Sequence, residues 1–314
     1  MKYISEMHEG ERVSEIFMIK NKISATTKNG KNYENVTIQD KTGTMDCKIW
    51  EPNDPGIDEF DKLDYVEVSG EIVSFNGALQ LNIRRARKAH EGEYDPSNYL
   101  PTSSKNIDEM FSELKELIES IENPSYKKLL KDIFVDDEDF SKKFRFSSAA
   151  KSVHHGFVGG LLEHTLSVTK LCDYYSKAYP ILKRDLLLTA AMCHDIGKVY
   201  ELSPFPENDY TDEGNFLGHI VMGSNMVGKR ATKIEGFAKN DLLQLQHCIL
   251  AHHGKMEFGS PKTPALIEAL ALSYADDTDA KMETFKEILE NNSSNQGWLG
   301  FQKFLEGNIR ATQG

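Results

Sequence analysis

Eight of the ten histidines in this 314-residue chain lie between His154 and His253. His164 stands in the apolar stretch Leu-Leu-Glu-His-Thr-Leu, and the pair His194-Asp195 follows Leu-Leu-Leu-Thr-Ala-Ala-Met-Cys. Neutral imidazoles and carboxylates together are a ligand set that first-row divalent metals accept. A buried carboxylate without a partner costs on the order of several kcal/mol, and a bound cation removes that cost. The crowding therefore predicts a metal centre.

Helices must position these side chains. From residue 107 onward apolar positions recur with a helical period, as at Met110, Leu114 and Ile118. The remaining chain is mostly helical in pattern, with breaks at Pro180 and at residues 203–206, 212–214 and 259–261. We expect ligands to project inward from several helices, as in metal-binding bundles. The helix that leads into His194-Asp195 is expected to stop at Gly197.

The first 90 residues have a different pattern. Five short alternating runs are separated by turn signals; they span residues 15–20, 33–38, 44–50, 65–73 and 79–83. Five strands in so short a segment favour a small closed barrel. Their order resembles an OB-fold, and residues 36–50 are similar to the hairpin of nucleic-acid-binding OB domains. We expect a barrel over 1–90, a linker over 91–106 and a helical domain over 107–314, with its metal core at 150–285.

Composition limits the class of protein. The length fits about two domains, and 39% hydrophobic residues exclude wholesale disorder. A net charge of −12 argues against binding of nucleic acid by overall positive charge. No run approaches the ~20 apolar residues of a membrane helix, and the N-terminus lacks a signal-peptide core, so we expect a cytoplasmic protein without a membrane partner. The four scattered cysteines predict reduced thiols and no cysteine zinc site.

Order and spacing of the ligand residues carry a family resemblance. His164, His194-Asp195 and Asp276 match the H…HD…D signature of the HD superfamily of metal-dependent phosphohydrolases. His219 and the doublet His252-His253 match its two-metal subset, which includes the HD-GYP phosphodiesterases. The Gly-Tyr-Pro hallmark is missing, because the chain continues Gly-Lys-Met-Glu-Phe-Gly-Ser-Pro. This departure argues against cyclic-di-GMP cleavage.

An OB domain followed by an HD domain resembles the YhaM family of bacterial 3'-5' exoribonucleases. The matching segments of the helical domain are residues 159–164, 194–198, 249–254, 258–261 and 274–281. The resemblance implies a multidomain chain, with an N-terminal all-β OB-fold barrel followed by an all-α HD-superfamily domain. It also implies a metal-dependent 3'-5' exoribonuclease that hydrolyses single-stranded RNA held by the OB domain.

The same resemblance implies a ligand set for two ions. One ion would be held by His164, His194, Asp195 and Asp276, and Asp195 would bridge to a second held by His219, His252 and His253. Mn²⁺ is favoured, with Co²⁺, Fe²⁺ and Zn²⁺ as alternatives that ligand type does not separate. Asp276 is preferred over Asp277, because the family pattern begins at the first acid, and Asp277 and Asp279 are expected to be exposed or to support the ligands.

Several residues are candidates for contact with the substrate. Lys198, four residues after His194, would neutralise a phosphate oxygen in a catalytic role beside Asp195; a solvated lysine is the alternative. His154, His155 and His247 would touch the phosphate or orient ligands, or be structural. In the barrel, aromatic and basic residues would bind RNA by stacking and charge. They are Phe17, Tyr33, Lys48, Trp50, Phe75, Arg84, Arg85, Arg87 and Lys88.

Trp50 and the basic run among these barrel candidates have alternative interpretations. Trp50 could equally belong to the core, and the basic run that ends at Lys88 could be a solvated final strand. Two other functions also stay open. One is a phosphohydrolase of small nucleotides, and the other is a nucleic-acid-binding factor with a structural metal. The sequence does not decide between RNA and single-stranded DNA, and it leaves self-association open.

Overall fold

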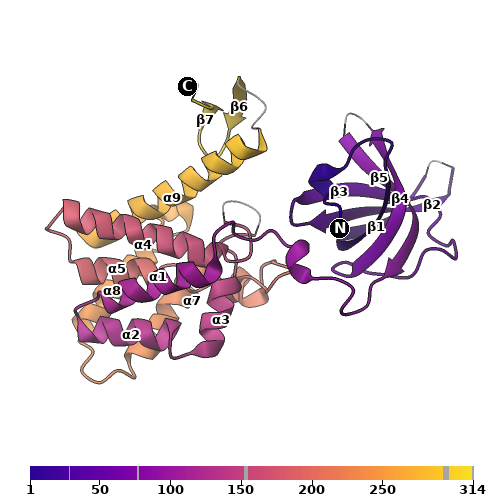
Figure 1. Cartoon of the computed structure of the whole chain (residues 1–314). Helices are drawn as coiled ribbons and strands as arrows, with labels where there is room; N and C mark the ends of the chain where they lie inside the picture. The colour runs from indigo at the N-terminus through magenta and orange to yellow at the C-terminus, as the bar shows by residue number, and fades with distance from the viewer. Residues whose placement is uncertain (28, 76–77, 152–154, 293–296, 313–314) are drawn as a thin grey trace. The chain divides into compact units, whose positions relative to one another are not determined.

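The computed structural model describes residues 1–27, 29–75, 78–151, 155–292 and 297–312. It divides the chain into two compact units, Met1–Thr102 and Ser103–Gly314. The first unit is a closed barrel with strand order β1-β2-β3-β5-β4, in which only the β3–β5 pair is parallel (Figure 1). The strands are β1 (Arg12–Thr26), β2 (Asn32–Asp40), β3 (Gly43–Ile49), β4 (Tyr65–Phe75) and β5 (Ala78–Lys88). The predicted OB-fold barrel is confirmed.

The register of the barrel strands is irregular at two places, one of them between Ile19 and Asn21 of β1 where it pairs with β2. The register of β4 against β5 shifts between Ser69 and Gly70. A Cβ at Gly70 would lie only 2.2 Å from the carbonyl oxygen of Asn82, so the two backbones can approach closely only because position 70 has no side chain. Inward residues such as Val36, Ile38 and Leu81 are buried in the hydrophobic core of the barrel.

The segment after β5 continues to pack on the barrel. The ring of Tyr94 stacks on that of Tyr65 at 3.9 Å, and Tyr99 meets the same ring edge-on. The side-chain amide of Gln39 donates to the carbonyl of Tyr99. Residues up to about 100 are therefore anchored to the first unit, although they fall within the predicted linker over 91–106.

The second unit is built from helices around one hydrophobic core (Figure 1). They are α1 (Ile107–Glu119), α2 (Pro124–Phe134), α3 (Glu138–Phe146), α4 (Gly160–Ala178), α5 (Arg184–Cys193), α6 (Lys198–Glu201), α7 (Asp212–Ala231), α8 (Lys239–Ala251) and α9 (Ile267–Asn291). The side chain of Asn106 caps α1 by accepting from the backbone N–H groups of Asp108 and Glu109. Across the described residues, no helix combines the length and apolar character needed to cross a bilayer.

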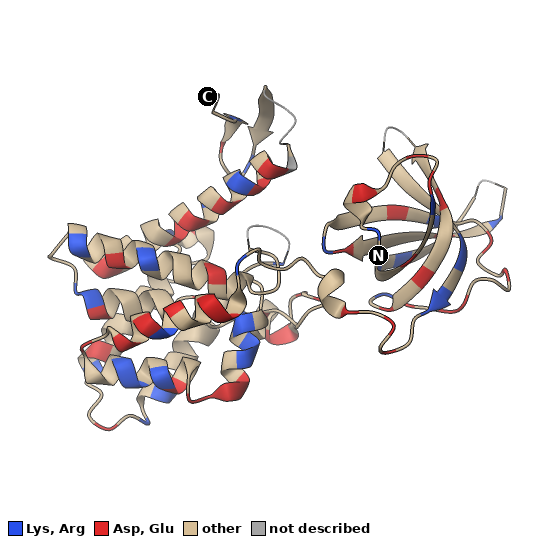
Figure 2. Cartoon of the chain, viewed as in Figure 1, with Lys and Arg blue, Asp and Glu red and all other residues tan. Residues whose placement is uncertain are grey.

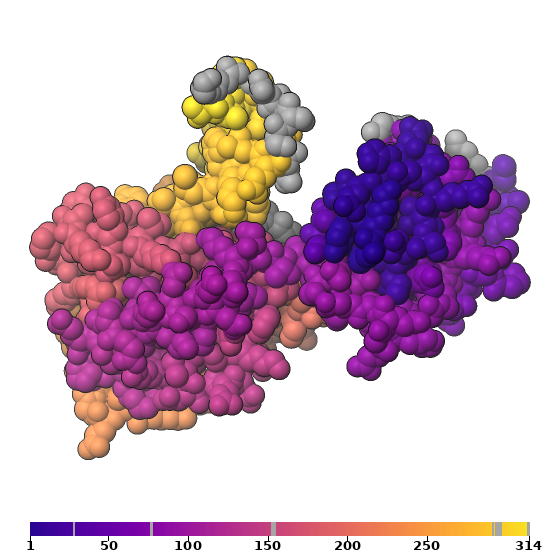
Figure 3. All heavy atoms as spheres, in the orientation of Figure 1, coloured from indigo at the N-terminus to yellow at the C-terminus, as the bar shows by residue number. Residues whose placement is uncertain are grey.

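Two local features differ from the sequence analysis. A C-terminal hairpin, β6 (Trp298–Gln302) with β7 (Gly307–Arg310), follows α9 and stands out from the rest of the second unit (Figure 3). The helix before His194 ends at Cys193, and the expected stop at Gly197 is wrong. Gly197 has ordinary right-handed dihedral angles. It is required for a different reason, because a Cβ there would lie 2.1 Å from the carbonyl oxygen of His219.

All four cysteines are buried and free of disulfides, as the sequence predicts. Acidic and basic residues are interspersed along both units (Figure 2). The negative net charge is therefore not concentrated in one unit.

Candidate metal centre

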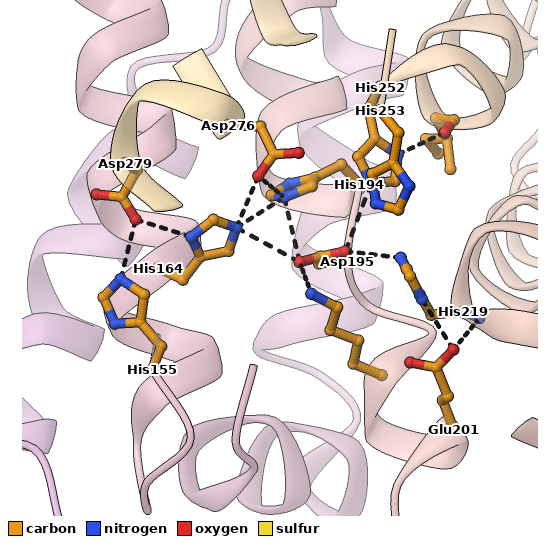
Figure 4. A network of polar contacts seen from close by, with 12 residues as sticks. His155, His164, His194, Asp195, Glu201, His219, His252, His253, Asp276 and Asp279 are labelled. Atoms are coloured by element: carbon orange, nitrogen blue, oxygen red, sulfur yellow. Dashed lines mark hydrogen bonds and ion pairs between the residues drawn. The ribbon is translucent and has the colours of Figure 1, made fainter. Parts of the chain in front are cut away.

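Five helices of the second unit bring the seven predicted ligands together (Figure 4). His164 lies in the second turn of α4, and Asp276 lies in the middle of α9. His194 and His252 each cap the C-terminal end of a helix, α5 and α8. His219 follows a break in α7 at Gly218, where φ is 72°. Two donors thus lie at helix ends and one follows a kink. This arrangement brings together side chains that straight helices would keep apart.

The carboxylate of Asp195 is the centre of the arrangement. Its Oδ2 lies 3.4 Å from Nε2 of both His164 and His194. Its Oδ1 lies 3.4 Å from Nε2 of His219 and 3.6 Å from Nε2 of His252. The two oxygens therefore face two sets of donors, which we call the first donor group (His164, His194, Asp276) and the second donor group (His219, His252, His253).

In the first donor group, two imidazoles and one acid converge. The Nε2 atoms of His164 and His194 are 3.2 Å apart, and Oδ1 of Asp276 is 3.2 Å from the first of them. Burial opposes a charge on His164, but contacts with Asp195, Asp276 and Asp279 outweigh it and raise the pKa of this imidazole well above its ordinary value. The carboxylates that favour a positive charge on His164 would also favour a bound cation.

The second donor group contains polar atoms without partners. Within the described part of the chain, Asp195 Oδ1, His219 Nε2 and His252 Nε2 are buried and make no hydrogen bond. Each such atom costs about 1–3 kcal/mol when unsatisfied. Burial lowers the pKa of His252 far below its ordinary value and keeps the ring neutral, which is the form that binds metal. These residues therefore fit a divalent cation.

A second layer of contacts fixes every imidazole. The Nδ1–H groups of His194, His252 and His253 donate to the backbone carbonyls of Ala191, Ile249 and Phe258, all at 2.7 Å. Nδ1 of His219 donates to Glu201 at 2.9 Å, and Nδ1 of His164 donates to Asp279 at 2.8 Å (Figure 4). Because Nδ1 is occupied in each ring, Nε2 is the atom left to face the centre.

Glu201 supports the predicted ligand His219 and was not predicted from the sequence. Its Oε1 accepts from both the backbone N–H and the ring Nδ1–H of His219, each at 2.9 Å. Burial alone would raise its pKa, but the bonds to His219 lower it, so the carboxylate stays charged. No spacing in the sequence marks Glu201, since its role arises only when α6 packs against α7. Asp279 plays the same part for His164, in keeping with the expected supporting role, whereas Asp277 is exposed.

We predict that Glu201→Gln weakens cation binding at the second donor group about 10–100-fold, because the ring of His219 loses its charged anchor. The first donor group should keep its affinity. Isothermal titration with Mn²⁺ would resolve the two events. Glu213→Gln, at an exposed position in the first turn of α7, is the matched control. Two unchanged binding events in Glu201→Gln would contradict this role.

Lys198 lies beside the centre, at the start of α6. Its Nζ is 2.7 Å from Oδ2 of Asp195. Burial opposes the charge of this lysine, but Asp195 raises its pKa, so the ammonium is retained. The residue is therefore close enough to the donors to meet a bound phosphate, and its contact with substrate stays a prediction.

The other three histidines lie outside the donor groups or outside the described residues. His155 is buried behind His164, with Nε2 3.0 Å from Asp279. His247 accepts the backbone N–H of Ala265 and lines a cavity with Lys262 and residues of α7. His154 is not among the described residues. Their roles toward substrate stay predictions.

On the barrel, the aromatic candidates divide by burial. Phe17 is completely buried, so its assignment as a platform for bases is wrong. Trp50 is half exposed; its ring stacks on Tyr33 at 5.2 Å, and its Nε1–H donates to Asn82. Lys48 lies over the ring of Tyr33. Strands β2, β3 and β5 thus present aromatic, amide and basic groups together.

The basic run of β5 is partly neutralised within the barrel. Arg87 pairs with Glu67 and Glu93, and Lys88 pairs with Asp64 at 2.8 Å. Arg84 is far more exposed and lies 3.6 Å from Glu71, and Arg85 is also exposed. Arg84 and Arg85 are therefore better placed to meet a phosphate backbone than the other two.

Comparison with known proteins agrees with both units. The HD domain family model matches residues 161–281, and an OB-fold nucleic acid binding domain model matches residues 17–89. The 3'-5' exoribonuclease YhaM of Geobacillus sp. (strain WCH70) is 36% identical over 282 residues, which cover 90% of this chain and 86% of the relative. The second OB-fold domain of replication protein A from Methanococcus maripaludis matches 30% of this chain and 98% of its own, at 20% identity; its TM-score of 0.23 is too low to bear on the fold.

Proposed function

Because this chain belongs to the YhaM family of 3'-5' exoribonucleases, we propose that it removes nucleotides from the 3' end of single-stranded RNA at a centre of two divalent cations. The observation that carries this proposal is the position of Asp195, whose two carboxylate oxygens face separate donor groups. Binding of a divalent metal itself is expected of an HD domain.

Cations bound in such a centre activate water and polarise a phosphodiester. The chain's own residues would bind the cations and orient the phosphodiester. Burial of Asp195 would raise its pKa, but Lys198 and His194 outweigh burial and hold that pKa well below its usual value, so the bridging carboxylate stays charged. Lys198 is expected to neutralise a non-bridging phosphate oxygen.

Mn²⁺ is the ion that we propose, in keeping with the family. The donors are imidazoles and carboxylates, with no thiolate among them, and such a set also accepts Co²⁺, Fe²⁺ or Zn²⁺. Loading the metal-free protein with each ion in turn, followed by an RNA assay, would rank them.

A ladder assay tests the function. RNA labelled at its 5' end should shorten stepwise in the presence of Mn²⁺, and EDTA should stop the reaction. A hairpin with a paired 3' end should be degraded more slowly than an unpaired strand. Intact RNA together with rapid turnover of cyclic dinucleotides would overturn the proposal.

For the barrel, we predict that Trp50→Ala raises KM for a long single-stranded RNA about 5- to 150-fold, because a stacked base is worth ~1–3 kcal/mol. Hydrolysis of a dinucleotide should not change, since a substrate this short needs no second binding surface besides the metal centre. Trp298→Ala, on the exposed C-terminal hairpin, is the matched control. It should change neither KM for the long RNA nor hydrolysis of the dinucleotide. Equal KM values for wild type and Trp50→Ala would remove Trp50 from the RNA-binding surface.

A further inference from the structure

The metal centre is partly exposed beside both donor groups, and in the first group the side chain of Asp276 is 16% exposed. The side chains of His194, Asp195 and His252 have almost no exposed surface. His219 is 13% exposed, and His253 is also partly exposed. These two residues belong to the second donor group, so a polynucleotide that reaches the centre from this side passes the segments that carry them.

Both segments expose large apolar side chains. Phe216 and Leu217 come directly before Gly218 and His219, and Phe216 is 86% exposed. On the other segment, Met256 and Phe258 follow His253, and Phe258 is 60% exposed. The carbonyl of Phe258 accepts the Nδ1–H of His253 at 2.7 Å, so this exposed phenylalanine is tied directly to a donor of the centre.

At the start of α7 large apolar side chains are exposed, whereas a surface helix usually buries them. The break at Gly218 separates residues 212–217 from the rest of α7. This short piece buries Gly214, whose Cβ would lie 2.3 Å from the carbonyl oxygen of Glu201. It exposes Phe216 and Leu217, the residues that an ordinary amphipathic helix would bury. Adjacent exposed apolar side chains of this kind mark a binding surface.

We propose that Phe216 and Phe258 form a stacking platform for the bases of the last nucleotides at the 3' end of the RNA. The inference rests on the proposed function, since it assigns the occupant from the substrate. An exonuclease that proceeds through any sequence must hold every base, and stacking on aromatic rings does so because all bases have a π-face. Only Leu217 and Gly218 separate Phe216 from His219, so the Cα atoms of Phe216 and His219 are at most about 11 Å apart.

A positive charge adjoins the platform. Nζ of Lys255 lies 5.0 Å from the ring centre of Phe258 and pairs at 3.3 Å with the exposed Glu257. Such a pair on the surface is weak, so the ammonium can exchange it for a phosphate of the strand. The segment after His253 thus offers both an aromatic face and a cation.

The test combines protein variants with base removal. Phe216→Ala and Phe258→Ala should each raise KM for single-stranded RNA about 5- to 150-fold. Neither should change kcat or the Mn²⁺ titration, because neither ring holds a donor. On RNA whose last two nucleotides are abasic, wild type and both variants should have the same raised KM, since the rings have nothing to stack on.

Tyr179→Ala is the matched control. This exposed aromatic residue follows α4, 15 residues after His164, which is about 22 Å along a helix. It should leave KM unchanged. A KM equal to that of wild type in both phenylalanine variants would overturn the inference, as would an equal loss on normal and abasic RNA. Failure of the wild type to shorten RNA at all would overturn the proposed function and this inference with it.

Discussion

Asp195→Asn is expected to reduce RNA shortening by roughly 10²–10⁴-fold, because losing the charged partner of buried groups costs about 3–5 kcal/mol. Each carboxylate oxygen of Asp195 faces one of the two donor groups. Asparagine keeps the shape of the side chain but removes its charge and one acceptor. We therefore expect weaker binding of both cations, which isothermal titration with Mn²⁺ and a labelled-RNA assay would measure together.

The control for Asp195→Asn lies in the acidic run of α9. Asp277 is adjacent to the predicted ligand Asp276 but is exposed and pairs with Lys281. Asp277→Asn should keep its activity and both binding events. If Asp195→Asn bound two Mn²⁺ ions with the affinity of wild type, the bridging role of Asp195 would be wrong.

The second large effect is expected from Gly197→Ala, which adds a single methyl group. That carbon would lie 2.1 Å from the carbonyl oxygen of His219, far inside van der Waals contact, so α6 and α7 must separate. The ring of His219 would then move away from Oδ1 of Asp195. We expect the second binding event to disappear from the Mn²⁺ titration and the RNA activity to fall about 100-fold or more, since misplaced groups cost that much.

Gly223 offers the matched control for this change. It lies on α7, one turn after His219, and a Cβ there would make only an ordinary contact at 3.4 Å with the backbone of Gly197. Gly223→Ala should preserve both titration events, and the stronger helix propensity of alanine favours the folded state by about 1 kcal/mol. A titration of Gly197→Ala with two normal events would show that α6 and α7 tolerate the methyl group.

The convergence of the candidate ligands could be predicted because metal chemistry restricts such donors to a few residue types. His164, Asp195 and Asp276 stand out in apolar helices where imidazole and carboxylate are otherwise costly. Glu201 has no such mark, since its partner is a ring on another helix. The role of Gly197 was hidden for the same reason, because a close approach between two backbones leaves no pattern in either segment.

It was harder to predict which side chains of the barrel are buried than where its strands lie. Phe17 and Trp50 are both large aromatic residues in β-rich sequence, yet the first is fully buried and the second is half exposed. Alternation identifies a strand, but the side that faces inward depends on register and closure. The C-terminal hairpin was missed because its strands are short and, in β6, mostly exposed, so neither has a clear alternating pattern.

The donors of the first group are separated by more than a hundred residues of chain, from His164 to Asp276. An ion held there acts as a removable cross-link between the beginning and the end of the helical unit. By mass action, a ligand present at a thousand times its dissociation constant adds about 4 kcal/mol to the free energy of unfolding. Scarcity of metal would therefore leave the enzyme more prone to unfold and to be degraded, in addition to stopping its turnover.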